Sequence, residues 1–120
     1  MDGRFGALEL YDASLTVAML RGVRIDYLNL RGSTLTDVTF ADCHIGELDL
    51  GDATLTRVAV KDSRITDLTL PGATLQDVDL RGATLTGVTG LAHLRGATIT
   101  GAQLEAIAPL LADEWGINVG

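Results

Sequence analysis

The chain has 120 residues, of which 47% are hydrophobic and only 4% aromatic, and its net charge is −7. This length allows one domain with a single apolar core, and the acidic balance argues against a general affinity for nucleic acid or anionic lipid. The one cysteine, Cys43, excludes an intramolecular disulfide, and no run approaches the roughly 18 apolar residues of a membrane-spanning helix. We therefore expect a cytoplasmic protein without a membrane segment.

The main pattern is an apolar residue that returns every five positions from Phe5 to Leu85. Helices repeat at about 3.6 residues and strands at about 2, so this period must belong to a larger unit. Two positions before each apolar residue the chain carries an uncharged side chain, and two positions after it Gly or Asp is usual. Each unit therefore predicts a short extended step with two inward side chains, followed by a corner. The predicted central core positions are Leu10, Leu15, Leu20, Ile25, Leu30, Leu35, Phe40, Ile45, Leu50, Leu55, Val60, Ile65, Leu70, Leu75, Leu80 and Leu85.

A period of 20 residues is superimposed on the five-residue step. The inward position two residues before the central one holds leucine in every fourth unit, at Leu8, Leu28, Leu48 and Leu68. Four steps then make one coil, and successive coils hydrogen-bond at the usual strand spacing of about 4.8 Å. The prediction is an all-β solenoid over residues 1–90, a quadrilateral β-helix of four to five 20-residue coils. Leucine-rich repeats and left-handed six-residue β-helices need other spacings.

The repeat units resemble those of the pentapeptide-repeat proteins, whose repeat is summarised as A(D/N)LXX. The matching units are ATLTR at 53–57, ATLQD at 73–77, ATLTG at 83–87 and STLTD at 33–37, with Thr in place of Asp or Asn. The resemblance extends over roughly residues 3–90. It implies a right-handed quadrilateral β-helix, and most members of this family lack an evident activity.

Residues 91–120 predict a C-terminal cap on the same domain. The five-residue step fails at Gly90, and an irregular segment leads to a helix at about 101–115 and a short tail. Thr100 and Gln103 stand in the positions of a capping box, and Gly116 is a stop signal. We expect an apolar helical face to lie over the last coil. The residues at this face or beside it, as cap or dimer contacts, are Leu104, Ile107, Leu110, Leu111 and Trp115.

Two features leave the role of the cap open. Pro109 predicts a kink or two short helices, and Leu110 then lies off the apolar stripe, available to a second copy. Some pentapeptide-repeat proteins dimerise through such a cap, so the resemblance implies a homodimer as one alternative, and closure of a monomer as the other. The tail GINV alternates like a strand. No cap precedes Phe5, so either a partner covers the first coil or the chain belongs to a longer solenoid.

No motif for a nucleophile, a phosphate loop or a paired metal site occurs, so we predict no enzyme and no catalytic, cofactor-binding or metal residues. Cys43 occupies an inward position and His44 the next, outward one, so the two cannot share a metal. Cys43 is predicted as a core filler, and His44 is expected to stack between Arg24 and Arg64. His93, before the cap, is interpreted as structural or exposed.

Two acidic groups are predicted at corners of the tube. Asp77 and Asp79 flank one corner, and a larger group gathers at another. Such carboxylates could hold a divalent cation, but turn chemistry already explains acids at corners. The larger group consists of Glu47, Asp49, Asp52 and Asp67.

Threonines form an outward ladder on one wall. A flat ladder of this kind resembles the ice-binding face of some insect antifreeze β-helices, although threonine also suits any exposed strand position. The ladder consists of Thr34, Thr36, Thr54, Thr56 and Thr74, extended by Ser14 and Thr16.

Three functions follow as hypotheses. The first is a non-enzymatic scaffold that binds a protein partner, not identified by the sequence, through its faces or ends. The second is a DNA mimic that modulates a type II topoisomerase, as in the quinolone-resistance members of the family that it resembles. B-DNA over the ~20 to 25 Å of four to five coils carries roughly 12 to 15 negative charges, however, which disfavours mimicry by a chain of net charge −7. Ice binding is the third, and we expect neither nucleic-acid nor membrane binding.

Overall fold

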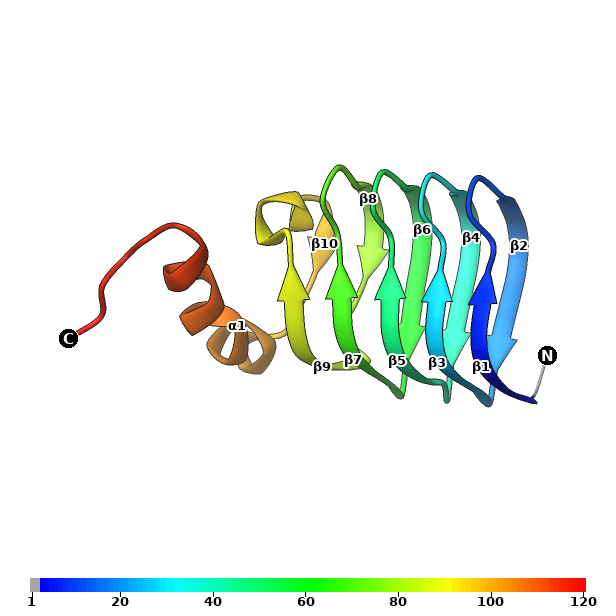
Figure 1. Ribbon diagram of the computed structural model, residues 1–120, viewed down its shortest axis with the longest axis horizontal. Helices are drawn as coiled ribbons and strands as arrows, with labels where there is room; N and C mark the ends of the chain where they lie inside the picture. The colour runs from blue at the N-terminus through cyan, green and yellow to red at the C-terminus, as the bar shows by residue number, and fades with distance from the viewer. Residues whose placement is uncertain (1–2) are drawn as a thin grey trace.

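The computed structural model describes residues 3–120, and the chain from Gly3 to Thr98 winds into a tube walled by two parallel sheets (Figure 1). Successive strands alternate between the sheets, whose orders are β1-β3-β5-β7-β9 and β2-β4-β6-β8-β10. Each coil therefore contributes one strand to each sheet. The strands are β1 (Gly3–Glu9), β2 (Ser14–Arg21), β3 (Val23–Asn29), β4 (Thr34–Ala41), β5 (His44–Asp49), β6 (Thr54–Lys61), β7 (Ser63–Thr69), β8 (Thr74–Asp79), β9 (Ala83–Thr89) and β10 (Ala97–Thr98).

Neighbouring strands pair with an offset of 20 residues. Ile25 lies opposite Ile45, which lies opposite Ile65, and Thr34 lies opposite Thr54 in the other sheet. Five strands in each sheet correspond to about five coils. The predicted β-solenoid with 20-residue coils is therefore confirmed.

A corner lies within the strand, and the side chains on each side of it point into the tube. In β4, Leu35 and Val38 are both buried although they are three residues apart, because Asp37 between them turns the chain with φ 57°. Asp and Gly are the usual residues with positive φ at these corners, where their cost is lowest, as the spacing predicted. Val17 (φ 51°) and Arg57 (φ 52°) are the exceptions among the described corners.

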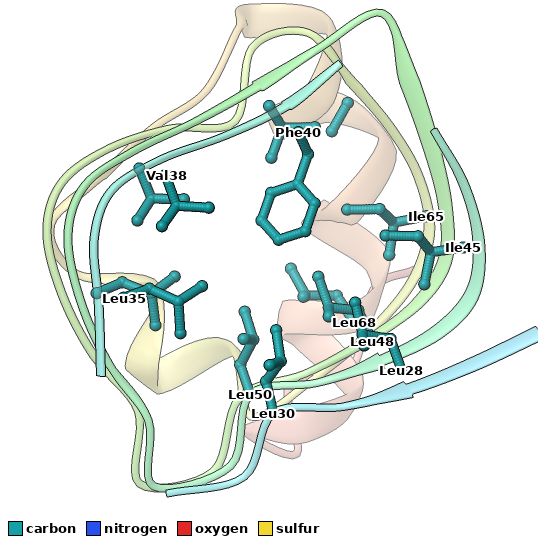
Figure 2. Close-up of a cluster of buried hydrophobic side chains, with 14 of the residues drawn as sticks. Leu28, Leu30, Leu35, Val38, Phe40, Ile45, Leu48, Leu50, Ile65 and Leu68 are labelled. Carbon is teal, nitrogen blue, oxygen red and sulfur yellow. The ribbon is translucent and has the colours of Figure 1, made fainter. Parts of the chain in front are cut away.

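The apolar side chains meet in the middle of the tube, where Figure 2 shows leucines, isoleucines and Phe40 from successive coils pointing inward. Four predicted core positions are only half-buried: Leu10, Leu15, Leu20 and Leu85. They belong to the first and last coils, which have a neighbouring coil on one side only. The side chain of Phe5 lies outside the described ones. The buried predicted positions are Ile25, Leu30, Leu35, Phe40, Ile45, Leu50, Leu55, Val60, Ile65, Leu70, Leu75 and Leu80.

Small polar side chains inside the tube tie coils together. The Oγ of Ser33 accepts a hydrogen bond from the backbone N–H of Ala13 at 3.1 Å, and that of Ser63 accepts one from the N–H of Cys43 at 3.0 Å. The thiol of Cys43 is fully buried and donates to the carbonyl of Leu20 at 3.3 Å. Cys43 is thus a core residue, as predicted.

The segment after β9 first extends the tube by part of a coil and only then leads into the helix of the cap. Gly90 precedes a short 3-10 helix, η1 (Leu91–Leu94), and β10 then pairs with β8, so the second sheet extends beyond the predicted boundary at residue 90. The helix α1 (Gly101–Glu114) follows. The capping box at its start is confirmed, and so is the stop at Gly116, whose φ is 67°.

Pro109 lies inside α1, which is one continuous helix, so of the two expected alternatives, a kink or two short helices, the second was wrong. Both Pro109 and Glu105, whose carbonyl loses its helical partner, are exposed, so water can satisfy the freed carbonyl. Residues 117–120 form no strand, in contrast to their alternating pattern. Within residues 3–120, no helix is long and apolar enough to cross a membrane.

Candidate functional site

The predicted threonine ladder lies on the second sheet. Thr34, Thr54 and Thr74 are in register and exposed, whereas Thr36 and Thr56 are in register but half-buried. Ser14 and Thr16 continue the two columns into the first coil, and Gln76 ends the inner one. The result is a flat polar wall with one fully exposed column of hydroxyl groups.

An ion pair borders this wall at the next corner. Arg57 Nε lies 2.6 Å from Asp37 Oδ1, and the two residues occupy equivalent positions in neighbouring coils. The hydrogen bond from Arg57 lowers the pKa of the Asp37 carboxyl. Both side chains are exposed, so the pair adds little to stability. It places charges along the edge of the threonine wall.

A column of cationic side chains runs along the first sheet. Arg4, Arg24, His44 and Arg64 stand in register, which confirms that His44 lies between Arg24 and Arg64. A groove of about 200 Å³ follows this column, where Gly46 carries no side chain. Within residues 3–120, no carboxylate lies within ion-pair distance of these three arginines. Acidic residues border the column on both sides, at Asp42 and Asp62 and at Glu47 and Asp67.

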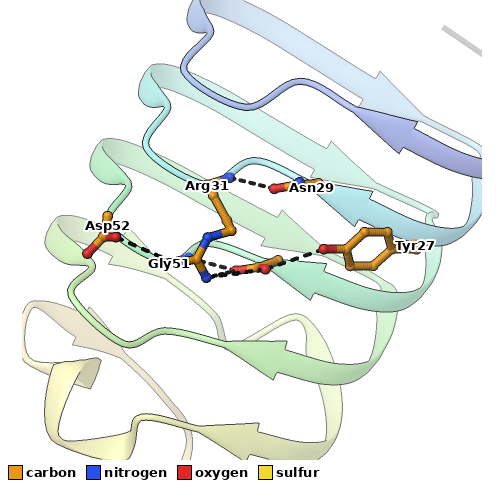
Figure 3. Close-up of polar contacts among 6 residues, drawn as sticks. Tyr27, Asn29, Arg31, Gly51 and Asp52 are labelled. Carbon is orange, nitrogen blue, oxygen red and sulfur yellow. Dashed lines mark hydrogen bonds and ion pairs between the residues drawn. The ribbon is translucent and has the colours of Figure 1, made fainter.

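The predicted acidic corner around Asp49 is a network of structural contacts (Figure 3). Asp49 is buried, with its side chain 10% exposed, and its carboxylate accepts hydrogen bonds from the backbone N–H of Gly51 at 3.0 Å, from Arg31 at 3.3 Å and from the Tyr27 hydroxyl at 3.4 Å. Arg31 also reaches Asp52 Oδ2 at 3.5 Å. Arg31 therefore links two acids that had been grouped as candidate ligands, and the network ties two coils together.

The same environment affects Tyr27. Burial, with smaller contributions from the nearby carboxylates of Asp49 and Glu47, raises the pKa of its phenol above the ordinary value of 10.0. The neutral phenol can donate its proton to Asp49, whereas a phenolate would face two negative charges. Tyr27 thus acts as a hydrogen-bond donor that holds Asp49 in place.

The remaining acids do not converge either. Glu47 and Asp67 are adjacent in register, while Asp79 is bound by Arg81 at 3.0 Å, a contact that lowers the pKa of the Asp79 carboxyl. Asp77 is exposed at the neighbouring corner. In the part of the chain that the structure describes, no group of three or more His, Cys, Asp or Glu residues could hold a metal ion.

The cap touches the last coil less than its apolar stripe predicted. Ile107 is buried and Leu110 and Leu111 are half-buried, but Leu104 is 51% exposed and Trp115 62% exposed. The expectation that these two lie over the last coil was therefore wrong. In Figure 1, α1 extends away from the end of the tube. Hydrogen bonds hold it there instead of a continuous apolar contact.

Two side chains of α1 make those hydrogen bonds. Gln103 Nε2 donates to the carbonyls of Leu80 and Ala83, at 2.6 and 2.7 Å. Near the other end, Glu114 Oε2 accepts from the backbone N–H of Leu91 at 3.1 Å. The sequence pattern identified Gln103 only as a capping residue, because the carbonyls that it binds become available only where the solenoid ends.

Large exposed apolar side chains lie at both ends of the molecule. Among the described residues, none belongs to the coils between Arg21 and Leu94. Sequence reasoning missed those of the first coil because it followed the inward positions. A comparison of equivalent outward positions would have found them, since Asp37 and Thr39 occupy in the second coil the places of Val17 and Met19. The exposed residues are Tyr11, Val17 and Met19 at one end and Leu104, Trp115, Ile117 and Val119 at the other.

Comparisons with known proteins give matches among solved structures only. No protein-family model matches the chain, and no curated protein matches it either. Among solved structures, the chain is similar to a trypsin-treated form of QnrB1, described as a plasmid-mediated fluoroquinolone resistance protein, with 13% identity and a TM-score of 0.40 over 98% of this chain and 100% of that chain. The solenoid of this chain is established by the 20-residue register of its own strands and not by this match.

Proposed function

We propose that this chain is a non-enzymatic cytoplasmic scaffold that docks another protein molecule through the surface of its C-terminal cap. The observation that carries the proposal is the exposure of Leu104 on α1 and of Trp115 directly after it, together with Ile117 and Val119 in the tail. Large apolar side chains gathered at one end of a small protein are typical of contact surfaces, and tryptophan is enriched among residues that dominate binding energy. The half-buried Leu110 and Leu111 extend this surface.

The polar groups of the tube support a structural role. Asp49, Asp79 and Ser63 are engaged within the tube, through Arg31, Arg81 and the backbone N–H of Cys43. The grooves beside His44 are shallow and lie along a flat wall, with no buried acid or base turned into them. Such walls suit contact with a protein surface better than enclosure of a small substrate.

A second copy of the chain is the partner that we propose for the cap, as a homodimer. Trp115 is the only tryptophan, so its fluorescence reports directly on this surface. The experiment compares the solution mass of the wild type, Leu110→Asp and Trp115→Ser over a dilution series, and the tryptophan emission of the first two. We expect the wild type to associate with a blue-shifted emission, Leu110→Asp to lose the blue shift, and both variants to lose the association through the cap. Thr54→Asp, on the polar wall, is the matched control.

Two outcomes would contradict the cap proposal. One is a wild type that stays monomeric at high concentration with the emission of a solvent-exposed indole. The other is a Leu110→Asp chain with the same association as the wild type. Circular dichroism of each variant checks that α1 and the sheets remain folded.

The charge distribution disfavours the DNA-mimic alternative. The row formed by Arg4, Arg24 and Arg64 interrupts any continuous negative surface on the first sheet, and phosphate-like potential needs closely spaced negative charge. We expect no effect on DNA gyrase supercoiling at micromolar concentration. Ice binding is disfavoured because Thr36 and Thr56 are half-buried and the Asp37–Arg57 pair borders their wall.

A further inference from the structure

We propose that the first coil is a second self-association surface, on which the first coil of another copy stacks end to end. This surface, the N-terminal end face, consists of the described residues 3–22 and lies at the opposite end of the tube from α1 (Figure 1). It is independent of the cap surface, because the two lie at opposite ends of a molecule 46 Å long.

The outward side chains of the first coil are unlike those of the coils that follow. Val17 is 77% exposed, Tyr11 60% and Met19 50%. At the equivalent places the second coil carries Asp37 in place of Val17 and Thr39 in place of Met19. A polar wall therefore becomes apolar where the tube ends.

The backbone conformation of Val17 is also unusual for its residue type. Its φ of 51° lies in the left-handed region, which is unfavourable for a β-branched residue. Asp37 and Asp77, at the same place in later coils, adopt this conformation at lower cost. The corner takes this conformation in every coil, at Arg57 as well, and in the first coil it presents an exposed apolar side chain that is available for a contact with another molecule.

The inside of the first coil is also incompletely covered. Leu10, Leu15 and Leu20 are half-buried, whereas the corresponding leucines and Phe40 of the second coil are buried. Among the described strands, β1 pairs only with β3 and β2 only with β4, so each has a free outer edge. Unpaired strand edges above an open apolar core are the usual template for pairing with another chain.

The charge and the area of the N-terminal end face, and the symmetry of a two-fold pair, favour a second copy of the chain as its binding partner. Residues 3–22 carry two cationic side chains, Arg4 and Arg21, and two acidic ones, Glu9 and Asp12, so this end is neutral in a chain of net charge −7. Two copies related by a two-fold axis can pair identical strand edges in antiparallel fashion. The 23 × 22 Å cross-section offers roughly 500 Å² per copy, or about 1,000 Å² in all, where specific interfaces begin.

The test uses Leu110→Asp as a background in which the cap surface is blocked. We expect this chain to form a dimer of twice the 12.6 kDa chain mass by sedimentation. Small-angle scattering should give a particle about twice as long as the 46 Å monomer. Adding Val17→Asp with Met19→Thr, the residues of the second coil, should weaken this dimer by about tenfold or more. Thr54→Asp, added instead, should leave it unchanged.

The same variants separate this inference from the proposed function, on which it does not depend. With both surfaces active, the wild type should form species larger than dimers, each singly blocked chain should stop at dimers, and the doubly blocked chain should be monomeric. A monomeric Leu110→Asp chain at every concentration would overturn the inference and leave the cap proposal standing. So would a dimer of that chain that survives Val17→Asp with Met19→Thr. Because aspartate suits the backbone at position 17, the double substitution should not lower the thermal midpoint of the monomer.

Discussion

Gln103 binds the carbonyl oxygen of Leu80 with its side-chain amide, at a distance of 2.6 Å across the junction between α1 and the last coil. The same amide reaches Ala83, and its oxygen accepts the N–H of Thr100. Carbonyls that would otherwise pair with a further coil are thereby satisfied by one side chain. The junction between helix and tube therefore depends on a polar residue, while the apolar stripe of the helix remains largely free for other contacts.

Replacing Gln103 by Ala should destabilise the protein by about 1 to 3 kcal/mol, because the carbonyls of Ala83 and Leu80 lose the Gln103 amide, of which only that of Leu80 keeps another donor, the N–H of Ala83, and because the helix loses its capping box. Chemical denaturation followed by circular dichroism measures the change. Gln76→Ala is the control, since Gln76 is exposed on the threonine wall. Equal effects of the two substitutions would show that the amide contacts contribute nothing at the junction.

Gly46→Ala should be costly because a Cβ at this position would clash with the carbonyl oxygen of Asp26 in the preceding coil. We expect a loss of about 1 to 3 kcal/mol, as for other overpacked sites. Gly6 holds the equivalent place in the first coil, where a Cβ would meet nothing within 4 Å. Gly6→Ala should therefore change stability by no more than about 0.5 kcal/mol. A tolerated Gly46→Ala would contradict the close approach of the coils.

The thiol of Cys43 should react with Ellman's reagent only when the solenoid opens. Its side chain is fully buried and donates to the backbone carbonyl of Leu20, and a buried thiol in apolar surroundings is inert. The measurement is the labelling rate over a denaturant series, which should follow the unfolding of the sheets. Immediate labelling of the native protein would mean that residue 43 faces outward, against the observed register.

Tyr27 should ionise at a pH above 10.0, because burial and the carboxylates of Asp49 and Glu47 raise its pKa. The folded state then holds the phenolic proton more tightly than the unfolded state, so the contribution to stability is complete below pH 10.0 and is lost as the pH rises through the folded-state pKa. A spectrophotometric titration of Tyr11→Phe, in which Tyr27 is the sole tyrosine, measures the shift.

Asp49→Asn in the same background should bring the ionisation of Tyr27 back toward 10.0, because it removes one of the charges that oppose the phenolate. An unchanged titration curve would mean that Asp49 does not act on the phenol.

The tube, its 20-residue coil and its corners could be predicted from the residues alone. These follow from local rules: the alternation that places Leu30, Leu50 and Leu70 inside, and the left-handed conformation that Asp and Gly adopt cheaply. The start and end of α1 were also predictable, because a capping box and a glycine stop act within a few residues.

Only the tertiary structure decided what happens at the ends and corners of the tube. Helical spacing placed Leu104 and Trp115 on an apolar face, but spacing cannot say whether that face meets the last coil; the docking depends on where the free carbonyls of Leu80 and Ala83 lie. From the sequence, Asp49 was one of four acids grouped at a corner. In the fold, Arg31 and Tyr27 of the preceding coil bind its carboxylate. Such contacts join residues about 20 positions apart, and their geometry exists only once the coils have stacked.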